Sequence, residues 1–371
     1  MLLEPINISQ LEIPNRFVRS ATHEWLAENN GKPTYKLAEM YEELARNEVG
    51  LIITGYSYVN PRGKSANNQQ GIYTDDFIEP YSQVVSRVHR YNSKIMLQIV
   101  HGGRQSLVSK DYPALAPSAV TDEATGITPV EMSESQILQT IEDFANAARR
   151  AKAAGFDGVQ LHCAHGFLLS NFISPYTNRR TDKWGGSVEN RTKIITEIIK
   201  RIRGMTLDMD YPITVKLNST DGFGSDSDKP GLDINDTIQI AKILQQNGVN
   251  AIEVSGGIFE THLMSQQNID SVEKEAYFKK NAKLIKNAVD IPVILVGGVR
   301  SKYIMEKIIS ADNADMISLS RPFICEPDLV AKIKEGISEE SQCVSCNLCF
   351  DSTGIKCNYF KKSETSTSSL N

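Results

Sequence analysis

Long apolar runs are missing from this chain. No stretch approaches the roughly 18 consecutive apolar residues that indicate a membrane-spanning helix. The opening segment, MLLEPINISQ, carries an acid at Glu4 and has neither the basic nor the apolar region of a signal peptide. We therefore expect a protein without a membrane partner, located in the cytoplasm.

An excess of basic residues is missing too. The chain has 40 Lys and Arg residues against 45 Asp and Glu residues, for a net charge of -5 and a pI of about 5.8. Proteins that bind nucleic acid use clustered positive charge to neutralise phosphates. We therefore expect no nucleic-acid partner and predict a small-molecule substrate instead.

Cysteine is scarce and unevenly spread. Two of the six cysteines, Cys163 and Cys325, stand alone in the sequence. The other four lie close together near the C-terminus: Cys343, Cys346, Cys349 and Cys357. This distribution is unlike the disulfide framework of a small secreted protein.

Short apolar, β-branched runs recur along the chain and predict eight strands with helices between them. The predicted strands are Phe17–Ser20, Gly50–Thr54, Ile95–Val100, Gly158–His162, Ile213–Asn218, Ala251–Val254, Val293–Val296 and Met316–Leu319. Ser133 and Gln136 have the spacing of a capping box before one helix, and Asp233 is a good N-cap for another.

Eight such alternations favour an α/β fold of the (β/α)8 TIM-barrel type. The alternative, a doubly wound open sheet, would need a Gly-x-Gly-x-x-Gly turn after an early strand, and the sequence lacks it. We predict one barrel domain over residues 1–336. A cysteine-containing extension follows over residues 337–371, ending in the polar tail KKSETSTSSLN, which we expect to be disordered.

Polar side chains fall late in three of the predicted strands. Gln98, His162 and Lys216 each lie on the polar-tolerant face of a strand, near its C-terminal end. Barrel active sites lie at this end. Any one of them alone is explained by a satisfied polar group in the core, whereas three together predict a site for a polar, planar ligand.

A second polar group follows the last two strands. Gly297 and Gly298 come directly after one strand, and Arg321 comes directly after the next. Barrels commonly bind phosphate at this point, because glycines let backbone N–H groups approach an anion and arginine adds a fork of donors. Ordinary turn glycines and a surface arginine are the alternative interpretation.

The stretch HCAHGFLLSNFISPYTNRRTDKWGGSVENR closely resembles the signature loop of the old yellow enzyme family of FMN-dependent NAD(P)H oxidoreductases. The resemblance extends over nearly the whole chain through Pro327, in the right order. It is carried by NRFVRSAT, GLIITG, LQIVHGGR, PITVKLNSTD, VSGG, LVGGVR and SLSRPFICEP. It implies a (β/α)8 barrel that binds FMN at its C-terminal mouth and takes electrons from NADH or NADPH.

The resemblance also implies individual roles. His162 and His165 match the pair that binds and polarises the oxygen of a carbonyl or nitro group for hydride transfer from flavin N5; zinc would need a third ligand, which we do not find nearby. Lys216 matches a position beside flavin N1 and O2 that is usually arginine. The residues implied to hold FMN are Ala21, Thr22, His23, Gly55, Gln98, Lys216, Ser255, Gly256, Gly257, Gly298 and Arg321.

The chain departs from the family pattern at several positions. Phe167 stands where the ene-reductases have a tyrosine that protonates the α-carbon, so the proton source is open, with Tyr56 and Tyr176 as candidates. His23 and Trp25 replace the cysteine and tyrosine of one branch. These departures put in doubt the substrate, and not the fold or the flavin.

The C-terminal cysteines have the spacing C-x2-C-x2-C-x7-C. The segment resembles the iron–sulfur segment of the dienoyl-CoA reductase branch, with shorter third and fourth spacings. Four thiolates bind either an iron–sulfur cluster or zinc, and a metal-free group of reduced thiols is the alternative.

Three functions are compatible with the sequence. The first is reduction of enones, nitro compounds or quinones by an FMN-dependent NAD(P)H oxidoreductase. The second is a flavin-binding electron carrier without efficient ene-reductase activity, because of Phe167. The third, an aldolase or isomerase barrel acting on sugar phosphates, predicts a colourless protein.

Overall fold

The computed structural model of the protein describes residues 1–109, 112–223, 227–261 and 266–360. The predicted tail at residues 361–371 lies outside the described residues. In the described part of the chain, no helix is long and apolar enough to cross a membrane.

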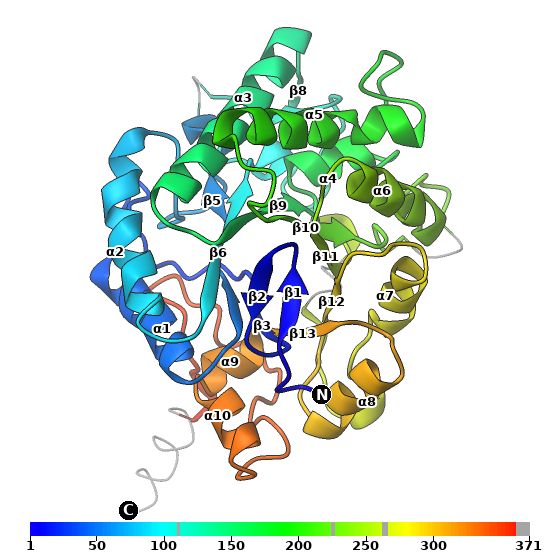
Figure 1. Cartoon of the computed structure of the whole chain (residues 1–371). Coiled ribbons are helices and arrows are strands. Elements are labelled where there is room, and N and C mark those ends of the chain that lie inside the picture. The colour runs from blue at the N-terminus through cyan, green and yellow to red at the C-terminus, as the bar shows by residue number, and fades with distance from the viewer. Residues whose placement is uncertain (110–111, 224–226, 262–265, 361–371) are drawn as a thin grey trace, which may run out of the picture.

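Eight parallel strands form a closed barrel, as predicted (Figure 1). They follow the order β4-β3-β13-β12-β11-β10-β9-β6, and a pairing of β4 with β6 closes the ring. Their bounds are β3 Phe17–Arg19, β4 Leu51–Ile53, β6 Lys94–Val100, β9 Gly158–Cys163, β10 Ile213–Asn218, β11 Ala251–Ser255, β12 Val293–Val296 and β13 Met316–Leu319. A short strand, β5 (Ser57–Tyr58), extends the sheet beside β6.

Helices surround the strands, and the capping predictions are confirmed. The side chains of Ser133 and Gln136 form both bonds of the capping box at α3, and the Asp233 side chain accepts from the backbone of Asp236 at α6. The helices are α1 Tyr35–Arg46, α2 Ile78–Val88, α3 Glu134–Ala153, α4 Leu168–Ile173, α5 Val188–Thr206, α6 Ile234–Gln246, α7 Lys279–Lys286, α8 Lys302–Ser310, α9 Arg321–Cys325 and α10 Leu329–Lys334.

The N-terminal hairpin covers one end of the barrel. It consists of β1 (Ile6–Ile8) and β2 (Leu11–Ile13), which pair antiparallel. Ile8 and Ile13 are fully buried against apolar side chains of the strands, and together they fill the barrel interior at that end. Burial of such side chains is worth about 1.5–3 kcal/mol each, so the hairpin closes this end firmly.

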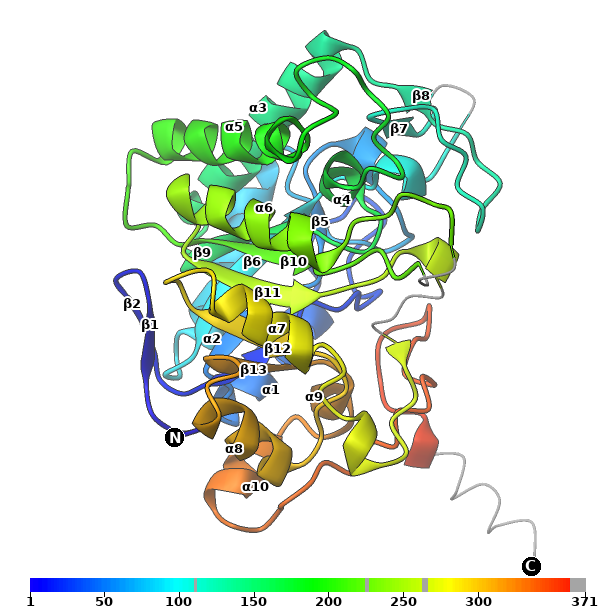
Figure 2. The same cartoon turned by 90° about the vertical axis from the view of Figure 1, so that its right-hand side faces the viewer.

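The opposite end of the barrel carries longer connections. A small pairing of β7 (Leu115–Ala116) with β8 (Val130–Glu131) lies at this end, together with the C-terminal segment, residues 338–360 (Figure 2). This C-terminal segment is tied to the loop before α8, because Lys302 N–H donates to Glu339 O and Ser341 N–H to Arg300 O. The division of the chain near residue 336 stays a prediction.

Candidate active site

The strand register brings the predicted polar residues together. Gln98 of β6 lies opposite Gln160 of β9, and His162 of β9 lies opposite Lys216 of β10. Lys216 in turn lies opposite Glu253 of β11. Because parallel strands present their C-terminal ends to one side, these side chains form one layer across the barrel mouth.

An amide and carboxylate chain runs through this layer. The Gln98 Nε2 donates to Gln160 Oε1 at 2.6 Å, and the Gln160 Nε2 donates to Glu253 Oε2 at 3.1 Å. Gln98 is fully buried, yet its Oε1 has no partner among the described residues. A buried acceptor without a donor is costly. The pyrimidine edge of a flavin, with its N3–H donor, fits this vacant acceptor.

Lys216 is the cation of the layer and is almost fully buried. Its Nζ donates to Ser20 Oγ at 2.7 Å and lies 3.4 Å from Glu253 Oε1. Burial lowers the pKa of Lys216, and the neighbouring Glu253 carboxylate works in the opposite direction. A positive group here suits the N1 and O2 edge of a flavin.

The two histidines stand side by side at the end of β9. Their ring centroids are 5.2 Å apart and the rings are nearly perpendicular, at 87°. Burial, followed by His165 and Lys216, lowers the pKa of His162 well below its ordinary value. Burial and Lys216 lower the pKa of His165 to about 3. Both rings are therefore neutral at physiological pH.

Hydrogen bonds set which ring nitrogens remain available. The Ala164 N–H donates to His162 Nδ1 at 3.4 Å, so the neutral ring carries its proton on Nε2 and can donate it. His165 Nε2 lies 2.7 Å from Ser255 Oγ. His165 adopts a left-handed φ of 63°, and its N–H donates to Asn218 Oδ1 at 3.1 Å, which holds the turn.

Aromatic rings line the space beside the histidines. Phe167 lies 4.7 Å from the His162 ring and 5.2 Å from the Tyr56 ring. The Tyr56 ring is 5.2 Å from His23, which lies 4.2 Å from Trp25. Burial lowers the pKa of His23 to about 4, so this wall, defined by these five rings, carries no charge at neutral pH.

The two candidate tyrosines lie in different places. Tyr56 is part of the aromatic wall, and burial raises the pKa of its hydroxyl, so Tyr56 keeps its proton. The Tyr176 hydroxyl instead donates to Glu123 at 3.2 Å, and its ring packs on Phe223. Of the two, it is Tyr56 whose ring lies near His162, with the ring centroids 6.2 Å apart.

A cavity follows β12 and β13, at the predicted phosphate site. Gly297 and Gly298 line it with positive φ values of 130° and 73°. A side chain at Gly298 would meet Ile269 and Tyr277, which explains the need for glycine. Arg321 lines the same cavity, so the fold brings it together with Gly298, as the sequence predicted.

Arg321 is also bound to the C-terminal segment. Its Nη1 donates to Asn347 Oδ1 at 2.8 Å, to Gln267 O at 2.9 Å and to Ser345 O at 3.3 Å. The arginine thus joins the cavity wall to the segment that carries the cysteines. The sequence did not predict this second set of partners.

The remaining predicted FMN residues lie near the mouth, with several of their groups engaged by the protein itself. The Thr22 hydroxyl lies 2.6 Å from Ser320 Oγ, which joins β3 to β13. The Gly55 N–H donates to the buried Glu24 at 2.9 Å. Ala21 packs on the barrel interior, Gly256 packs on Phe278, and the Gly257 N–H donates to Thr220 O at 2.9 Å.

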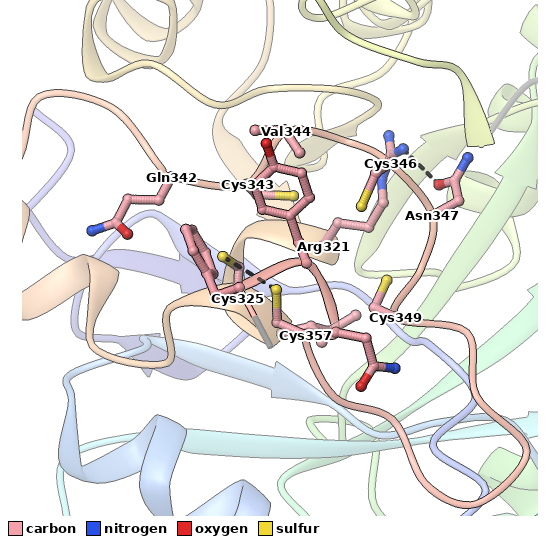
Figure 3. A pocket seen from close by; sticks show the side chains of 13 residues that line it. Arg321, Cys325, Gln342, Cys343, Val344, Cys346, Asn347, Cys349 and Cys357 are labelled. Atoms are coloured by element: carbon pink, nitrogen blue, oxygen red, sulfur yellow. Dashed lines mark hydrogen bonds between the residues drawn. The ribbon is translucent and has the colours of Figure 1, made fainter. Parts of the chain in front are cut away.

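Five cysteines line one cavity between α9 and the C-terminal segment (Figure 3). They are Cys325, Cys343, Cys346, Cys349 and Cys357. Cys325, which stands alone in the sequence, joins the other four in the fold, because its Sγ lies 3.8 Å from Cys357 Sγ. In the described residues, no group of three or more His, Cys, Asp or Glu side chains is arranged to hold a metal ion. As they stand, these thiols do not fit a metal centre.

The polar residues that sequence analysis overlooked are partners of the predicted ones. Glu253 is the centre of the set, with Ser20 and Ser318 donating to its Oε1 at 2.8 and 2.7 Å. A signal for Glu253 existed: one charged residue in the apolar strand AIEVS, on the same face as Ser255. Its partners could not be inferred, because they come from other strands.

Comparison with known proteins agrees with this geometry. The family model described as "NADH:flavin oxidoreductase / NADH oxidase family" matches residues 1–340. An NADH oxidase of Thermoanaerobacter brockii is 38% identical over 345 residues, which cover 92% of this chain and 52% of that protein. An NADPH dehydrogenase of Bacillus subtilis is 35% identical over 327 residues, covering 88% and 92%.

Among solved structures, a complex of 2-naphthoyl-CoA reductase with 2-naphthoyl-CoA has a TM-score of 0.85 at 26% identity. The matched region covers 94% of this chain and 54% of the reductase chain. The chain therefore spans about half the length of that protein and of the Thermoanaerobacter relative. With a family match over residues 1–340, on a barrel whose mouth offers an unpartnered amide oxygen and a buried cation, the chain belongs to the NADH:flavin oxidoreductase / NADH oxidase family.

Proposed function

We propose that this chain binds FMN at the barrel mouth and uses electrons from NADH or NADPH to reduce planar, electron-poor compounds. The observation that carries the proposal is the buried layer of Gln98, Lys216 and His162, in which Gln98 Oε1 has no hydrogen-bond partner among the described residues. The phosphate cavity at Gly298 and Arg321 supports FMN in particular. Family membership makes the flavin the expected cofactor, and each residue role is part of the proposal.

When bound, FMN supplies the hydride at N5. The protein's own part is to bind, orient and polarise. The Nε2–H of His162 donates a hydrogen bond to a substrate oxygen and polarises it, and it does so over a wide pH range because the ring is neutral and keeps its proton. His165, held by Asn218 and Ser255, gives a second contact to the same oxygen. Burial of the layer strengthens each of these polar contacts.

The aromatic wall supports a planar and uncharged substrate. Phe167, Tyr56, His23 and Trp25 form a run of ring contacts beside His162. Offset or tilted ring contacts of this kind stabilise a planar partner. A structural relative carries a naphthoyl thioester. Among the predicted classes, quinones and nitroaromatic compounds suit the wall best. Their oxygens take up the proton that completes the reduction, so they need no acid at position 167 to protonate a carbon atom.

Enones are the less favoured substrates of this site. The electron-carrier alternative remains distinct from the reductase, since it predicts flavin reduction by NADH or NADPH without rapid turnover of cyclohexenone. Steady-state turnover of the purified protein with cyclohexenone and with a quinone separates the two. Turnover of neither compound, with a flavin that NADH still reduces, would favour the carrier.

The first test is the absorption spectrum of the purified protein. A bound flavin is expected, and its identity as FMN is checked by mass spectrometry of the released cofactor. A protein that is colourless and takes up no added FMN contradicts the proposal and would favour a barrel that acts on sugar phosphates. The relatives' names support NADH and NADPH equally, so both are supplied in the assay.

Metal binding by the C-terminal cysteines, as an iron–sulfur cluster or zinc, is a separate proposal. It is supported by the resemblance of the cysteine spacing and by five thiols around one cavity. It requires the C-terminal segment to rearrange, since the described residues form no ready group of ligands. No step of the reaction above depends on it. A cytoplasmic location likewise stays a prediction.

A further inference from the structure

Lys216 raises a physical problem that the proposed function does not solve. The family usually has arginine at this position, and arginine keeps its charge under all conditions in proteins. Lysine does not, because burial favours the neutral amine. The Lys216 side chain is only 4% exposed, so a nearby anion is needed if Lys216 is to act as a cation.

Charged and titratable groups face Lys216 from three neighbouring strands. The positive charge of Arg19, from β3, lowers the pKa of Lys216 and so favours its neutral form. His162 of β9 and His165, just after that strand, are neutral, so they provide no negative charge beside Lys216. Glu253, from β11, supplies the negative charge, with its Oε1 at 3.4 Å from Lys216 Nζ. The Glu253 side chain is fully buried.

Three residues from outside β11 hold Glu253 in place. Ser20, just after β3, donates to its Oε1 at 2.8 Å, and Ser318 of β13 donates to the same oxygen at 2.7 Å. Gln160 of β9 donates to its Oε2 at 3.1 Å. Ser20 also accepts from Lys216 at 2.7 Å, so the hydroxyl bridges the two charges. Three donors and the Lys216 ammonium therefore surround the Glu253 carboxylate.

We propose that Glu253 is a positioning residue that keeps Lys216 protonated and directs its ammonium to the flavin pocket. The pair takes the place of the family's arginine, and the inference rests on the proposed function. Glu253 lies beside Lys216 in the layer, opposite it on the neighbouring strand, and acts through it. Its effect is therefore on the charge that Lys216 presents to the flavin.

The test compares the reduction potential of bound FMN in four proteins: the natural chain, Glu253→Gln, Lys216→Arg and the double variant. Reduction adds negative charge near N1, so a cation beside N1 raises the potential. The measurement runs from about pH 6 to about pH 9, below the ordinary lysine pKa of about 10.4. Glutamine keeps the shape of the side chain and removes its charge; its one oxygen accepts either from Ser20 and Ser318 or from Gln160, so one of these sets of hydrogen bonds is lost at every pH.

The expected result is a pH-dependent difference in the lysine background. At low pH, the Glu253→Gln variant keeps a charged Lys216 with no carboxylate beside it. The reduction potential of its bound FMN is therefore higher than that in the natural chain. As pH rises, Lys216 loses its proton in the variant, and the potential falls below that of the natural chain. In the Lys216→Arg background, the difference caused by Glu253→Gln stays constant with pH, because arginine keeps its charge.

Two results would overturn the proposal: a difference in the lysine background that does not change with pH, or the same pH dependence in the arginine background. The control is Glu42→Gln. It removes a buried carboxylate of the outer helix α1, paired with Arg87 of α2, and should not shift the reduction potential of the flavin. If Glu253→Gln does not fold, Ser318→Ala removes one donor to Glu253 and should give a smaller change of the same sign. A natural chain without flavin would refute the proposed function instead.

Discussion

Phe167 is the residue most directly linked to substrate choice. It is 6% exposed and packs on His162 and Tyr56, so a tyrosine here would place its ring against the histidine that we propose binds the substrate oxygen. General acid catalysis contributes about 10²–10⁴-fold. Phe167→Tyr is therefore expected to raise cyclohexenone turnover and to leave quinone turnover nearly unchanged, measured at steady state with NADH or NADPH.

Two further variants separate the acid from the packing. Phe167→Leu removes the ring without adding an acid and should not raise enone turnover. Tyr56→Phe should lower the residual enone activity if Tyr56 is the present proton source, as its place in the aromatic wall suggests. Flat enone turnover in Phe167→Tyr, with flavin and fold intact, would show that protonation is not the missing step.

Arg321 is the residue to test at the phosphate cavity. Arg321→Ala removes charge-assisted hydrogen bonds, which are worth roughly 1.5–3 kcal/mol. FMN affinity should fall roughly 10- to 100-fold, measured by fluorescence titration of apoprotein with FMN. Asn347→Ala is the matched control, since it removes the side-chain contact with Arg321 and leaves the arginine bound to Ser345 and Gln267. Unchanged affinity in Arg321→Ala would refute the phosphate assignment.

At the scale of elements, the C-terminal segment carries the open question of metal. If the cysteines bind iron or zinc, anaerobically purified protein will contain the metal at a stoichiometric level, measured by elemental analysis. Cys349→Ser, at a buried position in the segment, should then lower the metal content. Cys163→Ser, in the barrel strand β9, should not. Neither iron nor zinc in the natural chain would show that the metal prediction is wrong.

The elements also show what sequence reasoning can reach. The strands were predictable because period-two patterns and β-branched runs are local, and β10, β12 and β13 have the predicted bounds. Gln98, His162 and Lys216 were found by the same patterns. The contacts of Glu253 with Ser20 join positions 233 residues apart, and only the closed barrel brings them together. The pairing of Cys325 with Cys357 depends on a loop path that no local pattern encodes.

At the scale of the whole molecule, four of the six histidines are kept neutral by the fold. Burial lowers the pKa of His23 and of His101 to about 4. The pKa of His165 is lowered to about 3, and that of His162 falls well below its ordinary value. In the unfolded chain these rings titrate near 6.5. Below that pH the unfolded state binds more protons, so the free energy of unfolding must fall as the pH falls.

The size and sign of this effect can be measured. Each such histidine adds a slope of about 1.4 kcal/mol per pH unit between its folded and unfolded pKa values. Two carboxyls work in the opposite direction: burial raises the pKa of Asp221 to about 6 and also raises the pKa of Asp143, but these are two groups against four. Urea unfolding at about pH 6.5 and about pH 5 should therefore show lower stability at the lower pH, before general acid unfolding begins. Stability that stays constant or increases over this range would mean that these histidines bind protons in the folded protein, and the neutral pair at the substrate site would have to be abandoned.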